Sequence, residues 1–170
     1  MTSFRFLTIV VVVLALSVVM FGAGPHDSLS CTGCHGIHNA KTGELIFAVD
    51  PNKKLVNPTT KQVYTGTTAL CLGCHASEAD GGMGIAPVSP THSHPFGVVP
   101  NPKLASVPAE ALRDNKLECV GCHNPHPSNA NYKYLRVDTA GGSKMENFCA
   151  YCHSTEAGPA ATKAALAGSK

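Results

Sequence analysis

The chain carries eight cysteines, arranged as four pairs of identical spacing, and a histidine directly follows each pair. The four segments are "CTGCH" at 31–35, "CLGCH" at 71–75, "CVGCH" at 119–123 and "CAYCH" at 149–153. Disulfide bonds, zinc sites and covalent haem attachment all use paired cysteines. The residues around the pairs must therefore distinguish among these three chemistries.

The recurring histidine favours haem. With 9 histidines among 170 residues, a histidine at this position in all four segments is not expected by chance. A four-cysteine zinc site has no use for it, whereas C-x-x-C-H is the attachment signature of haem c. We therefore predict four covalently bound haem c groups, each held by two thioether bonds and ligated by the adjacent imidazole. The attachment residues are Cys31, Cys34, Cys71, Cys74, Cys119, Cys122, Cys149 and Cys152, and the iron-ligating histidines are His35, His75, His123 and His153.

Five histidines lie outside these motifs, and four irons need four further ligands to become six-coordinate. We predict that these ligands are His26, His38, His94 and His126, with His92 as the spare and as the alternative to His94. His38 and His126 each stand three residues after a motif histidine, which is too near to cap the same iron but suits an adjacent haem. An iron with two imidazoles has no open position for a substrate, so the pattern favours electron transfer over enzymatic catalysis.

The motifs form an internal repeat. "CTGCHGIH" matches "CVGCHNPH", and "CLGCHASEA" matches "CAYCHSTEA". The dipeptide "VD" also recurs, 18 residues after the first cysteine of each half. We predict a duplicated di-haem unit, residues 31–79 and 119–157, joined by residues 80–118 within a tetrahaem domain of residues 25–157.

Composition indicates the fold class. The chain has no Trp, 6% aromatic residues, 16 Gly and 12 Pro, so it has little material for an apolar core and much for loops. We predict a mostly irregular multihaem cytochrome c fold, with short helices around the C-x-x-C-H motifs, wrapped around a haem row. A helix over 107–116 and short strands over 44–49 and 62–67 are also predicted.

The two ends differ from this domain. An apolar run of 16 residues from Phe6 to Phe21 resembles a signal-peptide core and falls short of the ~20 residues that span a membrane comfortably. Residues 1–24 are therefore predicted to be a signal peptide or an N-terminal anchor, which implies export in either case. The Ala-rich tail, 158–170, is expected to be a short helix or frayed. A net charge of +2 without a Lys/Arg cluster argues against nucleic acid as a partner.

The doubled "CHxxH" pattern, the "SHPFGV" segment at 93–98 and the four C-x-x-C-H motifs resemble outer-surface multihaem c-type cytochromes. The likeness covers most of residues 25–156 and is closest to tetrahaem members that polymerise into extracellular filaments, or nanowires. The resemblance implies a secreted or cell-surface subunit that conducts electrons through stacked bis-histidine haems. Its partners would be copies of itself and redox proteins or extracellular electron acceptors.

In that family, a histidine of the N-terminal CHxxH motif reaches into the neighbouring subunit and completes its haem coordination. Here the resemblance assigns this role to His38, and the receiving haem would be the last, at Cys149, Cys152 and His153. The alternative is a monomeric or membrane-anchored periplasmic tetrahaem electron carrier.

Overall fold

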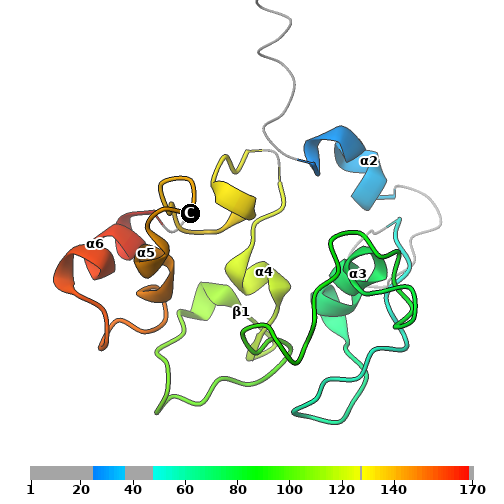
Figure 1. Cartoon of the computed structure of the whole chain (residues 1–170), viewed down its shortest axis with the longest axis horizontal. Coiled ribbons are helices and arrows are strands. Elements are labelled where there is room, and N and C mark those ends of the chain that lie inside the picture. Colours follow the sequence, from blue (N-terminus) through cyan, green and yellow to red (C-terminus); the bar gives the residue numbers. More distant parts are fainter. Residues whose placement is uncertain (1–24, 37–47, 127, 169–170) are drawn as a thin grey trace, which may run out of the picture.

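The computed structural model describes residues 25–36, 48–126 and 128–168, and most of them lie in turns and irregular segments (Figure 1). The regular elements are η1 (Asp27–Leu29), α2 (Ser30–Cys34), α3 (Gly66–His75), η2 (Ala109–Ala111), β1 (Leu112–Arg113), β2 (Lys116–Leu117), α4 (Cys119–Cys122), η3 (Tyr132–Tyr134), α5 (Met145–Cys149) and α6 (Pro159–Gly168). The predicted class, mostly irregular with short helices, is confirmed.

Each of the four motifs begins within a short helix, namely α2, α3, α4 and α5. One helical turn places residues three apart on the same face, so both thiols of a pair are presented together. The turn is closed by the motif histidine, whose N–H donates to the carbonyl of the first cysteine. This bond measures 2.7 Å at His35, 2.9 Å at His123 and 2.9 Å at His153. The prediction of short helices at the motifs is confirmed.

Two small apolar clusters replace a single core. The first surrounds α3 and consists of Tyr64, Ala69, Leu72 and Ala76, with Leu55 and Phe96 packed against it. The second joins α5 and α6 and consists of Ala111, Val137, Ala150, Tyr151 and Ala165. In Figure 1, α3 lies on one side of the molecule, α5 and α6 on the other, and α4 between them.

Each of the two predicted di-haem units contains the same backbone hydrogen bond, at the same distance in sequence from its first motif. The Ala48 N–H donates to the Cys34 carbonyl at 2.8 Å, and the Arg136 N–H donates to the Cys122 carbonyl at 3.0 Å. Both donors stand 14 residues after the second cysteine of their motif. In both cases, a residue after the motif returns to the carbonyl of that motif's second cysteine.

The predicted helix over 107–116 is wrong. Only the three residues of η2 are helical, and a hairpin follows in which Leu112 pairs with Leu117 and Arg113 with Lys116. Asp114 and Asn115 form its turn with φ values of 49° and 62°. Asp and Asn tolerate this left-handed conformation, so a tight hairpin turn competes successfully with the helix.

The predicted strand over 62–67 is also wrong. Val63 forms an isolated bridge with Val56, and Gly66 already begins α3. Of the other predicted strand, 44–47 lies outside the described residues, and 48–49 form a bend.

The Ala-rich tail forms a helix. Its Ala165 is fully buried in the second apolar cluster, so α6 packs on the α5 side of the protein. Among the residues that the structure describes, no helix is long and apolar enough to cross a membrane. The predicted signal peptide or anchor, 1–24, lies outside them.

Candidate haem-binding sites

Each C-x-x-C pair has a thiol near a thiol of the next pair along the sequence. Interaction with the neighbouring Cys119 thiol raises the pKa of Cys71, and the same interaction lowers the pKa of Cys119. Burial and then the nearby Cys34 raise the pKa of Cys74. Burial and then the nearby Cys152 raise the pKa of Cys122 to about 11. The first motif is therefore next to the second, the second to the third, and the third to the fourth.

Three of the four motif histidines face a histidine from elsewhere in the chain. The ring centroids of His26 and His75 are 5.8 Å apart, and those of His94 and His153 are 6.3 Å apart. The centroids of His35 and His126 are 6.4 Å apart, with rings parallel to within 1°. Two metal–nitrogen bonds of about 2 Å, one on each side of a porphyrin, would separate the centroids by roughly 6 Å. The three pairs therefore fit haem iron.

Every facing pair joins distant parts of the chain. His26 precedes the first motif but faces the histidine of the second, and His126 follows the third motif but faces that of the first. His94 belongs to the connecting segment 80–118 and faces the histidine of the fourth motif. In each of these three pairs, the facing histidine lies outside the motif of its partner.

Backbone carbonyls orient two of the motif imidazoles. His75 Nδ1 lies 2.7 Å from the Ile85 carbonyl oxygen, and His123 Nδ1 lies 2.9 Å from that of Lys133. An Nδ1–H that donates to a carbonyl leaves Nε2 deprotonated and directed toward a metal. Both accepting residues lie ten positions after the histidine, so the second and third motifs orient their imidazoles through the same kind of backbone contact.

The environment of His26 favours the neutral imidazole that binds iron. Burial lowers its pKa, and the neighbouring His75 lowers it further. Its Nδ1 is buried and has no hydrogen-bond partner within the described ranges. The Tyr134 ring stacks on the His26 ring at 5.2 Å with an interplanar angle of 15°. The neutral imidazole is the form that binds a metal, so this environment is compatible with the predicted role of His26.

The remaining predicted ligands are placed differently. His92 is exposed, and its Nδ1 lies 3.0 Å from both the Ser89 and Thr91 hydroxyls. The structure thus brings His94, not His92, opposite a motif histidine. Among the described residues, no imidazole faces His123, and His38 lies outside them. Iron ligation by the eight predicted histidines stays a prediction.

A haem iron needs only two ligands from the polypeptide, because the porphyrin supplies four of its six ligands and two imidazoles supply the others. Within the described part of the chain, no group of three or more His, Cys, Asp or Glu side chains is arranged to hold a metal ion. None of the eight cysteines forms a disulfide bond in the structure.

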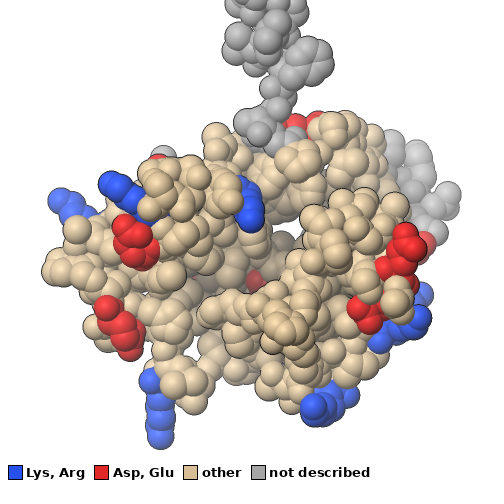
Figure 2. Space-filling model, viewed as in Figure 1, with Lys and Arg blue, Asp and Glu red and all other residues tan. Residues whose placement is uncertain are grey.

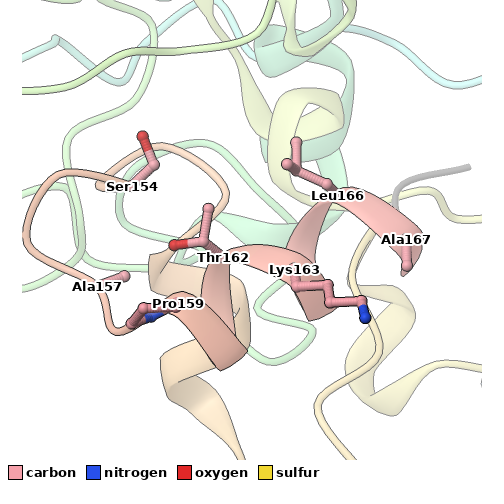
Figure 3. Close-up of a pocket in the computed structure, with 7 residues that line it drawn as sticks. All are labelled: Ser154, Ala157, Pro159, Thr162, Lys163, Leu166 and Ala167. Atoms are coloured by element: carbon pink, nitrogen blue, oxygen red, sulfur yellow. The ribbon is translucent and has the colours of Figure 1, made fainter.

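An open pocket near the fourth motif does not contribute to these sites. It has a volume of about 650 Å³ and lies between the loop after His153 and α6 (Figure 3). Its lining residues are Ser154, Ala157, Pro159, Thr162, Lys163, Leu166 and Ala167, and none of them is a predicted ligand.

Residues 111–158 match the family model for the doubled CXXCH motif, and the matched segment contains the third and fourth motifs. This match indicates a multihaem c-type cytochrome and favours electron transfer as its role. Comparison with curated proteins and with solved structures found no match for the chain.

Proposed function

We propose that the chain is a tetrahaem c-type cytochrome that carries electrons along a row of bis-histidine haems as a subunit of an extracellular filament. The observation that carries the haem assignment is the set of imidazole pairs, with centroids 5.8 to 6.4 Å apart at three of the four motifs. A haem iron takes up and releases one electron between its ferric and ferrous states, and two imidazoles keep it six-coordinate in both.

The order of the thiols supports a continuous row. Cys74 lies near Cys34, Cys119 near Cys71, and Cys152 near Cys122. Each predicted attachment site therefore has a neighbour in the next motif, and the haems would follow one another in the order of the sequence. The small apolar clusters are consistent with a chain that wraps its haems. On the face in Figure 2, the surface is hollowed between the two halves of the protein, and charged residues are scattered rather than gathered.

The filament proposal requires His38 to complete a haem of a neighbouring subunit. The resemblance implies that the last haem, at His153, receives His38. In the structure, however, His94 of the same chain faces His153. His123 faces no imidazole within the described residues. We therefore propose the third haem, at Cys119, Cys122 and His123, as the receiver.

The monomeric carrier has one observation in its favour. His126, from the third motif, faces His35 of the first. The repeat then suggests the reciprocal arrangement, in which His38 of the first motif caps the His123 iron of the same chain. Such a protein would be complete without a neighbour and would fit a periplasmic or anchored carrier.

The variant His38→Ala, produced in the full chain, separates the two functions. For the filament, we expect negative-stain images of the unmodified secreted protein to show fibres, and the variant to yield monomers with four haems, one of them high-spin. For the carrier, the unmodified protein is monomeric, and the variant has one high-spin haem without a change of assembly. Fibres that persist in the variant, with four low-spin haems, would exclude bridging by His38. The His92→Ala variant serves as the control, because His92 faces no motif histidine among the described residues.

For the filament we propose a secreted or cell-surface location, and for the carrier a periplasmic or membrane-anchored one. A secreted protein would be recovered outside the cell without residues 1–24, whereas an anchored or periplasmic one would stay with the cell envelope. Mass spectrometry of the N-terminal peptide in each fraction distinguishes these outcomes.

A further inference from the structure

A turn between the third and fourth motifs has an unusual backbone. Lys133 has φ 50° and ψ 31°, and Tyr134 has φ 58°. Two consecutive residues other than glycine in the left-handed region carry a cost in free energy, and such a conformation persists only where surrounding contacts hold it.

Main-chain contacts attach this turn to the third motif. The Asn124 N–H donates to the Tyr134 carbonyl at 2.7 Å, and His123 forms an isolated bridge with Leu135. The left-handed Lys133 directs its carbonyl to His123 Nδ1 at 2.9 Å. The turn thereby sets the orientation of the imidazole predicted to bind the third iron.

The next residue reaches a different haem site. The Tyr134 ring stacks on His26 at 5.2 Å, and its hydroxyl accepts a hydrogen bond of 3.1 Å from the His26 backbone N–H. The same hydroxyl lies 3.5 Å from Asp27 Oδ1. His26 in turn faces His75 of the second motif. Tyr134 is thus one of the contacts that hold the N-terminal segment, and it lies 108 residues from His26 in the sequence.

We propose that the Lys133–Tyr134 turn positions axial ligands of two neighbouring haems at once. The Lys133 carbonyl orients the His123 ligand of the third haem, and the Tyr134 side chain holds the His26 ligand of the second. The inference rests on the proposed haem ligation, and it makes Tyr134 a positioning residue that adjusts the ligand field and the reduction potential of the second haem.

The test uses the haem-loaded full chain and compares Tyr134→Leu, Tyr134→Phe and the control Tyr132→Phe. The side chain of Tyr132 is 41% exposed and packs beside Gly142 instead of a histidine. We expect Tyr134→Leu to keep four covalent haems but to change the low-spin ferric electron paramagnetic resonance signal of one of them. Ferrous CO binding should rise from none to about one haem in four. Tyr134→Phe, which keeps the ring, should shift the same signal and potential less, and Tyr132→Phe should change neither.

Substitution of Lys133 tests the shared role. Lys133→Gly permits the positive φ and keeps the carbonyl, so all signals should stay as in the unmodified protein. Lys133→Ile disfavours the positive φ, because a β-branched residue avoids this region, and should change the signals of both the second and third haems.

Two results would overturn the inference: a Tyr134→Leu protein with unchanged spectrum, potentials and CO binding, or a Lys133→Ile protein in which fewer than two haems respond. The proposed function fails differently, through an unmodified protein that lacks four covalent low-spin haems.

Discussion

Glu118 connects the helices of the second and third motifs, and its removal should destabilise the protein markedly. Its side chain is 4% exposed. The carboxylate accepts hydrogen bonds from the Thr67 hydroxyl and, at 3.1 Å, from the Thr68 backbone N–H, both in the first turn of α3. The Cys119 N–H then donates to the Thr68 hydroxyl at 3.3 Å, so the network extends into α4.

The expected loss follows from these contacts. Glu118→Ala removes two hydrogen bonds to a charged acceptor and leaves donors of α3 buried without a partner, which should cost about 3 kcal/mol. Glu118→Gln keeps an acceptor oxygen but loses the charge that favours a helix N-terminus, so about 1 kcal/mol is expected.

Urea unfolding of the haem-loaded protein, followed by far-ultraviolet circular dichroism, measures this loss. A loss of about 3 kcal/mol lowers the urea midpoint by roughly 1–2 M. Glu146→Ala is the matched control, because Glu146 is an exposed carboxylate in the first turn of α5. If Glu118→Ala lowers the midpoint no more than Glu146→Ala does, the reasoning about this network is refuted.

Three further predictions concern the ligands. Cys119→Ala should weaken or abolish one covalent attachment and reduce the pyridine haemochrome count from four haems to three; an unchanged count would contradict the assignment. His94→Ala should leave one iron high-spin, whereas His92→Ala should not, because only His94 faces His153; the reverse result would assign the ligand to His92. His126→Ala should leave the His35 iron five-coordinate and able to bind CO, and a protein that stays fully low-spin would show that the 6.4 Å pair does not hold an iron.

The helices at the motifs were predictable because their cause is local. A C-x-x-C pair must present two thiols on one face, and one helical turn does so. The fold class was predictable for a similar reason, since a chain rich in Gly and Pro and poor in aromatic residues forms few long elements. The hairpin at 112–117 is hard to predict because the "VPAEAL" segment at 107–112 has good helix formers, and only the turn preference of Asp114 and Asn115 opposes a helix.

The pairing of the histidines was not predictable from the sequence. The number of candidate ligands is known once the histidines of the sequence are counted. Which histidine faces which motif histidine depends on contacts between distant residues, such as His35 and His126, which are 91 positions apart. The roles of the Ile85 and Lys133 carbonyls cannot be recognised from the sequence. Every residue has a backbone carbonyl, and only the backbone conformation determines where it points. Tyr134 is likewise recognisable only once its ring lies on His26.

The central claim is that one chain binds four covalent, six-coordinate haems. The most direct measurement is the pyridine haemochrome content per chain of the purified full-length protein, combined with the intact mass and the ferrous CO difference spectrum. We predict four haems per chain, a mass increase of four haem groups and no CO binding. Fewer than four covalent haems in the unmodified protein, or zinc bound to its cysteines, would contradict it.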